Sequence, residues 1–185
     1  LIYSDPQQAL TLLQQISLDS LSSKEENAYY GLLLSHASDR NERNLLPCDS
    51  LLNLAIDYYR KGFNKGRSLF YKARLLTAMG MEDEAMGYYF GSLKEFGHTP
   101  REIRFKGMVY EDLGNIYFDQ AIYKEALEKY TTALKYYSII NDKKAMIYAS
   151  SMASSVCLVD SDNKKAHHFL NMEMQLAKEI NDSCY

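Results

Sequence analysis

The chain has few cysteines and no long apolar run, and each shortage excludes a class of structure. Only 3 of its 185 residues are cysteines: Cys48, Cys157 and Cys184. An odd number cannot form a closed disulfide framework, and the spacing lacks the Cys-x-x-Cys pair of common zinc sites. The longest apolar stretches, such as Leu32-Leu33-Leu34, are far shorter than the roughly 20 residues that cross a membrane. We therefore expect no transmembrane segment in this chain.

Positive charge is scattered rather than clustered. The formal net charge is −3, and no run of lysine and arginine is longer than two residues. Because binding to a phosphate backbone depends on clustered positive charge, we expect no direct nucleic-acid partner. Hydrophobic residues make up 46% and charged residues 24% of the chain, which is typical of a globular protein rather than a disordered one.

Helix-forming sequence, by contrast, is abundant. Pro6, Pro47 and Pro100 each stand where a helix could begin, a position that tolerates the missing N–H group. Ser23 followed by Glu26 predicts a capping box at one further start. No five-residue alternation of β-branched or aromatic residues competes, so we expect an all-α fold. The roughly nine expected helices lie near residues 5–17, 23–38, 48–61, 66–79, 82–96, 100–119, 123–139, 142–159 and 163–180.

A repeat with a period of about forty residues runs through the second half of the chain. Ala85, Ala126 and Ala166 are 41 and 40 residues apart. Each is followed four residues later by a bulky apolar side chain, namely Tyr89, Tyr130 or Leu170. Repetition at a fixed period of this size is typical of solenoids built from small supersecondary units. Such arrays usually serve as binding surfaces, because their stacked repeats create extended concave faces.

The best-preserved unit runs from Gly107 to Ile140. Its first helix contains Leu113-Gly114-x-x-Tyr117 and its second contains Ala126-x-x-x-Tyr130-x-x-Ala133. These residue types at these spacings resemble the tetratricopeptide repeat (TPR). The resemblance implies a right-handed α-α superhelix of about four helical hairpins. Gly114 costs about 1 kcal/mol relative to alanine inside a helix, so we expect the partner helix to approach it closely.

The rest of the chain matches the TPR pattern to different degrees. We expect one TPR-like array over 1–185, with divergent N-terminal helices at 1–63, a repeat at 64–99, the best repeat at 100–141 and a degenerate repeat at 142–182. In the repeat at 64–99, Lys72 and Ser92 replace the leucine and alanine of the pattern. The start at Leu1 without an initiator methionine and the loop-like end both indicate a piece of a longer protein.

A second resemblance concerns the N-terminal segment. The runs Asp5-Pro6-Gln7-Gln8-Ala9-Leu10, Tyr30-x-Leu32-Leu33-Leu34-Ser35 and Asp49-Ser50-Leu51-Leu52 are similar to the start of a TPR family of Bacteroidetes bacteria. Members of that family are typically secretory or lipid-anchored, and many continue into a regulatory tail. The resemblance implies an extracytoplasmic location, either periplasmic or lipid-anchored, with a cytoplasmic location as the alternative.

No arrangement of residues typical of catalysis or metal binding stands out. The segment Gly62-Phe-Asn-Lys-Gly66-Arg67-Ser68 lacks one residue between the glycines of a phosphate loop and has Arg where that loop has Lys. His167 and His168 are adjacent, so on a helix they point about 100° apart and cannot bind one metal ion as a pair. We therefore expect no enzyme activity, no cofactor and no metal site.

The TPR resemblance also implies that the first helix of each hairpin lines a groove for a protein or peptide. The groove residues that follow from this placement are Arg67, Phe70, Tyr71, Arg74, Met108, Glu111, Asp112, Asn115, Tyr148 and Ser151. Arg67 and Arg74 flank Tyr71 at helical spacing, which favours an acidic or carboxylate-bearing peptide. Tyrosine and arginine are both frequent anchors of interfaces.

The predicted function is therefore a non-enzymatic scaffold that binds a protein or peptide, within a bacterial regulatory or signalling protein. One alternative stays open. In it, the chain is the ligand-sensing or oligomerisation module of a transcriptional regulator whose DNA-binding part lies outside these residues. Self-association is left open in both cases.

Overall fold

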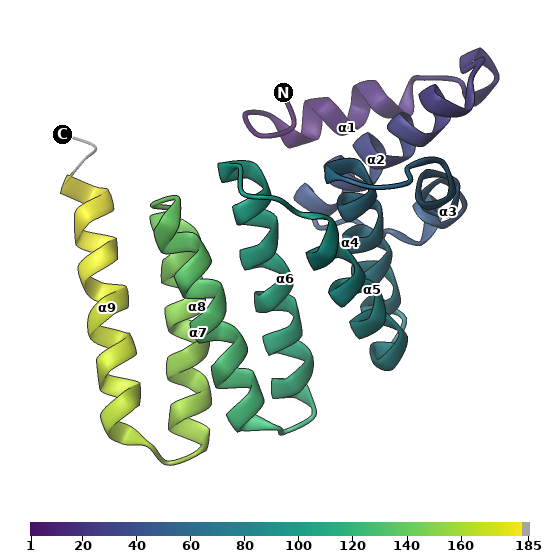
Figure 1. The fold of residues 1–185 in the computed structure, drawn as a ribbon. Coiled ribbons are helices and arrows are strands. Elements are labelled where there is room, and N and C mark those ends of the chain that lie inside the picture. The colour runs from purple at the N-terminus through teal and green to yellow at the C-terminus, as the bar shows by residue number, and fades with distance from the viewer. Residues whose placement is uncertain (183–185) are drawn as a thin grey trace. The chain divides into compact units, whose positions relative to one another are not determined.

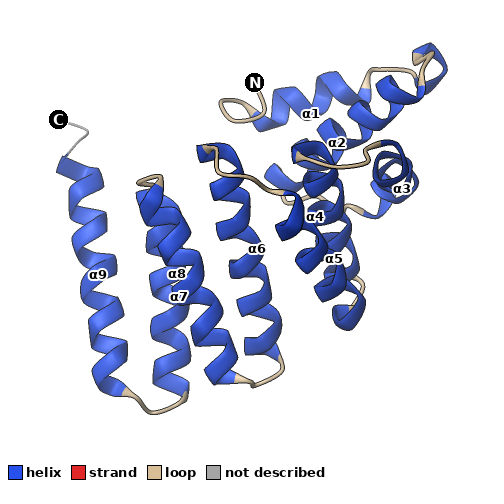
Figure 2. Ribbon diagram, in the orientation of Figure 1, coloured by secondary structure: helices blue, strands red, loops and turns tan. Residues whose placement is uncertain are grey.

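The computed structural model describes residues 1–182, in which helices are joined by short turns (Figures 1 and 2). Two short 3₁₀ helices, Leu18–Ser20 and Leu46–Cys48, accompany the α-helices, and these described residues contain no strand. The predicted all-α class is confirmed. The α-helices are α1 Pro6–Gln14, α2 Lys24–Arg40, α3 Asp49–Tyr58, α4 Phe63–Ala78, α5 Glu82–Glu95, α6 Pro100–Asp119, α7 Tyr123–Ile139, α8 Lys143–Val159 and α9 Asn163–Asp182. None of them is both long and apolar enough to cross a membrane.

The chain divides into two compact units, unit 1 from Leu1 to Phe96 and unit 2 from Gly97 onward. The division lies next to the boundary expected between the repeats at 64–99 and 100–141. In unit 1, α2 packs against α1, α3 and α4, and α4 pairs with α5. In unit 2, α6 packs against α7, α7 against α8, and α8 against α9, so that successive helices run in opposite directions (Figure 1).

Local sequence determines where several helices begin. The predicted capping box at α2 is confirmed, because the Glu26 N–H donates to Ser23 Oγ at 3.1 Å and the Ser23 N–H donates to Glu26 Oε2 at 2.9 Å. Helix α4 begins at Phe63, earlier than the predicted residue 66. The chain turns at Gly62, whose φ of 82° suits glycine, and the Gly62 N–H donates to the Glu95 carboxylate at 2.7 Å.

The turn inside each C-terminal hairpin has the same geometry. Gly80, Ala121 and Ser161, one in each turn, have φ of 74°, 59° and 61°. In each case the N–H of the next residue donates to the carbonyl oxygen five residues earlier, at 2.8–2.9 Å. This is the Schellman arrangement that ends a helix with one left-handed residue. The repeat seen in the sequence therefore corresponds to a repeated turn in the structure.

The three alanines that define the repeat occupy equivalent places. Ala85, Ala126 and Ala166 lie in the first turn of α5, α7 and α9, and each is at most 1% exposed. In the α6–α7 hairpin, the rings of Tyr130 and Tyr137 on α7 fill the space beside Gly114 and Gly107 on α6. A Cβ atom added to Gly114 would lie 2.7 Å from the ring of Tyr130. The close helix approach predicted at Gly114 is confirmed.

Candidate functional site

Three of the four predicted groove residues of α4 lie inside unit 1 rather than on its surface. Arg67 is 3% exposed, and Phe70 and Tyr71 are fully buried. Burial also raises the pKa of the Tyr71 hydroxyl far above its ordinary value. The prediction that these three side chains line an accessible groove is wrong, because α2 packs against α4 and these side chains are part of the buried interior of unit 1.

The cations of α4 are held by partners within unit 1. Arg74 Nη1 lies 2.7 Å from Asp39 Oδ1 and 2.9 Å from Asp39 Oδ2, and its guanidinium lies 4.7 Å from the centre of the Phe70 ring. Arg67 Nη2 lies 3.4 Å from Nδ1 of His36, a residue that is itself only 6% exposed. These arginines therefore join α4 to α2, and the acidic peptide predicted for them loses its structural basis.

Lys72, which stands where the expected repeat has a leucine, makes a contact between helices. Its side chain pairs with the carboxylate of Asp49 at the start of α3. A charged residue is accommodated at this position because α3 offers a charged partner. Lys72 is therefore explained by the packing of α3 against α4.

The remaining predicted residues lie on α6 and α8 in unit 2. Met108, Glu111, Asp112, Asn115 and Ser151 are half-buried, and Tyr148 is 45% exposed. Unlike Arg67, Phe70 and Tyr71, all of them retain surface that a partner could contact. We call Glu111, Asp112, Asn115 and Tyr148 the α6–α8 face.

Two tyrosine hydroxyls from α7 hold polar side chains of this face. The Tyr130 hydroxyl donates to Asn115 Oδ1 at 2.6 Å, and the Tyr137 hydroxyl donates to Glu111 Oε2 at 2.9 Å. Both rings are almost fully buried. A side chain that is hydrogen-bonded to a buried ring loses little further freedom when a partner binds.

Groups of the α6–α8 face also act electrostatically on the Tyr130 hydroxyl. Burial raises the pKa of this hydroxyl far above the ordinary value, and neighbouring groups from two helices raise it further. These neighbours are Tyr148 from α8 and the carboxylates Asp119, Glu111 and Asp112 from α6. The structure thus brings together predicted residues that lie up to 37 positions apart, from Glu111 to Tyr148.

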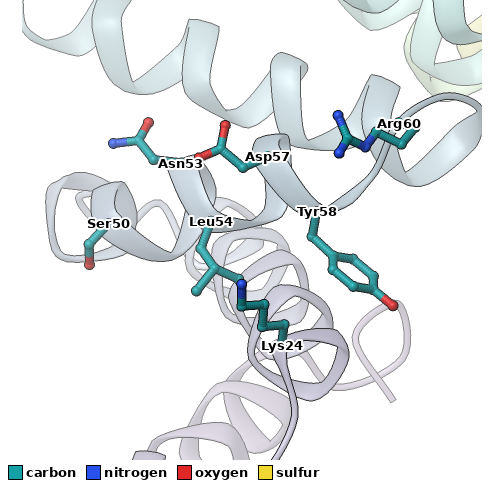
Figure 3. A pocket seen from close by; sticks show the side chains of 7 residues that line it. All are labelled: Lys24, Ser50, Asn53, Leu54, Asp57, Tyr58 and Arg60. Carbon is teal, nitrogen blue, oxygen red and sulfur yellow. The ribbon is translucent and has the colours of Figure 1, made fainter.

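A hollow on unit 1 was not foreseen from the sequence. It has a volume of about 760 Å³ and lies over the outward side of α3 (Figure 3). Its lining residues are Lys24, Ser50, Asn53, Leu54, Asp57, Tyr58 and Arg60. They come from the start of α2, from α3 and from the link to α4, so no spacing within one segment could have indicated the hollow.

Neither buried thiol has the environment of a nucleophile. Burial raises the pKa of both Cys48 and Cys157, which keeps each sulfur in its protonated form at neutral pH. Cys184 lies outside the described residues. Within residues 1–182 no three His, Cys, Asp or Glu side chains gather closely enough to hold a metal ion.

The fold is that of an all-α protein built from helical hairpins. Among solved structures it is similar to the crystal structure of BtubC (BKLC) from P. vanneervenii, with a TM-score of 0.73. The sequences are 17% identical, and the match covers 97% of this chain and 73% of that chain. At this identity the likeness concerns the fold alone. No model of a known protein family matches the chain, and no curated protein matches it.

Proposed function

We propose that this chain is a TPR-like, non-enzymatic scaffold that binds a protein or peptide through the α6–α8 face of unit 2. The observation that carries the proposal is the cluster around the Tyr130 hydroxyl. There buried tyrosines of α7 hold Asn115 and Glu111 by hydrogen bonds, and the exposed Tyr148 and the carboxylate of Asp112 act electrostatically on the Tyr130 hydroxyl.

The chemistry of the face suits recognition of a peptide. Tyr148 offers a large ring with a hydroxyl at its edge, the kind of side chain that often anchors an interface. Asn115 offers both donors and an acceptor, and the carboxylates offer acceptors. Because Asn115 and Glu111 are held by buried tyrosines, less conformational entropy is lost on binding.

The test begins with selection of peptides from a random display library on the immobilised chain. Peptides that bind the wild type are then measured against Tyr148→Ala, which removes the exposed ring from the face. The matched control is Tyr29→Ala, because Tyr29 is exposed to a similar extent, 48% against 45%, but lies on α2 in unit 1.

The proposal predicts that Tyr148→Ala weakens binding by about tenfold or more, as expected for loss of an aromatic anchor, while Tyr29→Ala has little effect. Equal affinities for the wild type and Tyr148→Ala would show that the selected peptides bind elsewhere. Failure to select any binder would count against the scaffold function itself. Melting curves of both variants verify that the fold is intact.

A further inference from the structure

We propose that the outward side of α5 binds a second copy of this chain, with the two α5 helices packed antiparallel across a twofold axis. This inference goes beyond the α6–α8 face, because it concerns another surface in the other unit. The product is a homodimer that forms as the protein concentration rises.

The outward side of α5 carries a regular stripe of residues. Ala85, Tyr89 and Ser92 form the buried side of the helix, and α5 packs against α4. On the opposite side, residues spaced by four, three and four positions are all exposed: Asp83, Gly87, Phe90 and Lys94. This spacing places side chains along one line, as it does where two helices pack together. We call these residues the α5 stripe.

Gly87 leaves an open place in the middle of the α5 stripe. In α4 and α6, helical glycines lie under an aromatic ring of the same chain, namely Gly66 under Phe96, Gly107 under Tyr137 and Gly114 under Tyr130. At Gly87, no atom of residues 1–182 lies within 4 Å of the place where a Cβ atom would stand. Because glycine is less favourable than alanine inside a helix, this open place costs stability that no contact within the chain offsets.

A hollow beside Gly87 offers room for a ring. It has a volume of about 420 Å³ and is lined by Leu69 of α4 and by residues of α5, namely Asp83, Glu84, Gly87 and Tyr88. The next residue of the α5 stripe, Phe90, is a large apolar side chain that is 43% exposed. The α5 stripe therefore has both a partly uncovered ring and, beside it, a space that no ring fills.

A twofold axis brings these features together. The pair Gly87 and Phe90 and the pair Asp83 and Lys94 have the same midpoint along the helix. When two α5 helices pack antiparallel about that midpoint, Phe90 of each copy lies over Gly87 of the other. The same arrangement places Asp83 of each copy opposite Lys94 of the other.

The charges of α5 favour a second copy in this orientation. The first turn is acidic, with Glu84 next to Asp83, and the last turn carries Lys94. Glu95, also in the last turn, is held by the N–H of Gly62. Antiparallel packing sets the acidic end of one helix against the basic end of the other, whereas parallel packing sets like charges together. An unrelated partner would have to carry the same ring, gap and charges in reverse order, which a second copy supplies by symmetry.

The size of the contact determines its strength. Helix α5 has 14 residues, and a single pair of such helices buries less than the roughly 1,600 Å² of a standard interface. We therefore expect a dissociation constant in the micromolar-to-millimolar range, so that monomer and dimer exchange as the concentration changes.

Sedimentation equilibrium of the full chain, from micromolar to millimolar concentration, measures the dissociation constant of the dimer. Gly87→Leu fills the space opposite Phe90 and should raise this constant at least about tenfold. The monomer should stay folded, because nothing crowds the Cβ position at Gly87. Phe90→Ala removes the ring and should weaken the dimer as strongly. The matched control Tyr29→Ala removes a ring of similar exposure, 48% against 43%, from α2 and should leave the constant unchanged.

An exchange of charges tests the antiparallel orientation. Asp83→Lys alone sets lysines against each other, and Lys94→Glu alone sets carboxylates against each other, so each variant should dimerise about tenfold more weakly than the wild type. A mixture of the two variants restores both ion pairs between unlike copies and should associate like the wild type. Circular dichroism melting verifies that every variant is folded.

A chain that stays monomeric at millimolar concentration would show that a second copy does not cover the α5 stripe, which overturns the proposal. Unchanged dimerisation of Gly87→Leu overturns it as well, because the copies would then meet at another surface. A mixture that associates no better than the single charge variants excludes the antiparallel pairing. Tyr148→Ala should dimerise like the wild type, so the result does not depend on the α6–α8 face.

Discussion

The ring of Tyr130 occupies the space where a side chain on Gly114 would lie. A Cβ atom at Gly114 would be 2.7 Å from the ring, while the Tyr130 hydroxyl donates to the neighbouring Asn115 at 2.6 Å. The same arrangement recurs at Gly107, which lies against the ring of Tyr137, whose hydroxyl donates to Glu111. The glycines thus let α7 lie close enough for its tyrosines to reach polar residues of α6.

Gly114→Ala should therefore destabilise unit 2. The ring of Tyr130 is fully buried and lies within van der Waals distance of the added methyl group, so the substitution overpacks the hairpin and lowers its stability by about 1–3 kcal/mol. Gly87→Ala in α5 is the matched control, because nothing lies within 4 Å of the position of its Cβ.

Gly87→Ala should have the opposite effect. We expect it to raise the free energy of unfolding by about 0.5–1 kcal/mol, because alanine loses less backbone entropy than glycine when a helix forms. Urea unfolding followed by circular dichroism measures both changes. A neutral or stabilising effect of Gly114→Ala would mean that α6 and α7 are not in close contact at this glycine.

The relation between Gly114 and Tyr130 could be predicted, because both residues belong to one hairpin and their spacing repeats along the chain. The same holds for Ala85, Ala126 and Ala166, whose burial follows from the period alone. Contacts within a hairpin depend on residues close in sequence, and these leave a periodic signal in the sequence.

The position of Arg67 and Tyr71 could not be predicted in this way. Their burial depends on α2, which lies about thirty residues earlier and carries no clear repeat. The hollow over α3 has the same origin, since its lining comes from α2, α3 and the link to α4. Such contacts follow from tertiary structure, which a motif in one segment does not encode.

The ion pair between Asp39 and Arg74 provides a test of the structural role of α4. Asp39→Ala removes both hydrogen bonds to the guanidinium in a place where the two side chains are only 14% and 24% exposed. We expect a loss of about 2 kcal/mol in the stability of unit 1.

Glu128→Ala is the control for this change, because Glu128 pairs with Lys129 on the surface of α7 and its side chain is 68% exposed. Ion pairs on the surface contribute little to folding stability, so the midpoint of urea unfolding of Glu128→Ala should stay almost the same as that of the wild type. Similar small effects of both substitutions would show that the ion pair between Asp39 and Arg74 is not needed to hold α2 against α4.

The left-handed residue in each hairpin turn gives a final pair of substitutions with opposite effects. Ala121 has φ of 59°, a conformation that costs an L-residue roughly 1–2 kcal/mol, whereas Gly80 adopts the equivalent conformation without a Cβ atom. Ala121→Gly should stabilise unit 2 by about 1 kcal/mol, reduced somewhat by the greater freedom of glycine in the unfolded chain. Gly80→Ala should destabilise unit 1 by a similar amount.

Both residues are exposed, and nothing lies within 4 Å of the Cβ position at Gly80, so backbone strain alone determines the result. The measurement is the change in unfolding free energy from urea titrations of the two single variants. Because the turns have the same geometry, the two changes should be close in size and opposite in sign. Two changes of the same sign would mean that Gly80 and Ala121 do not occupy equivalent positions, and the structural repeat would then not extend from α4–α5 to α6–α7.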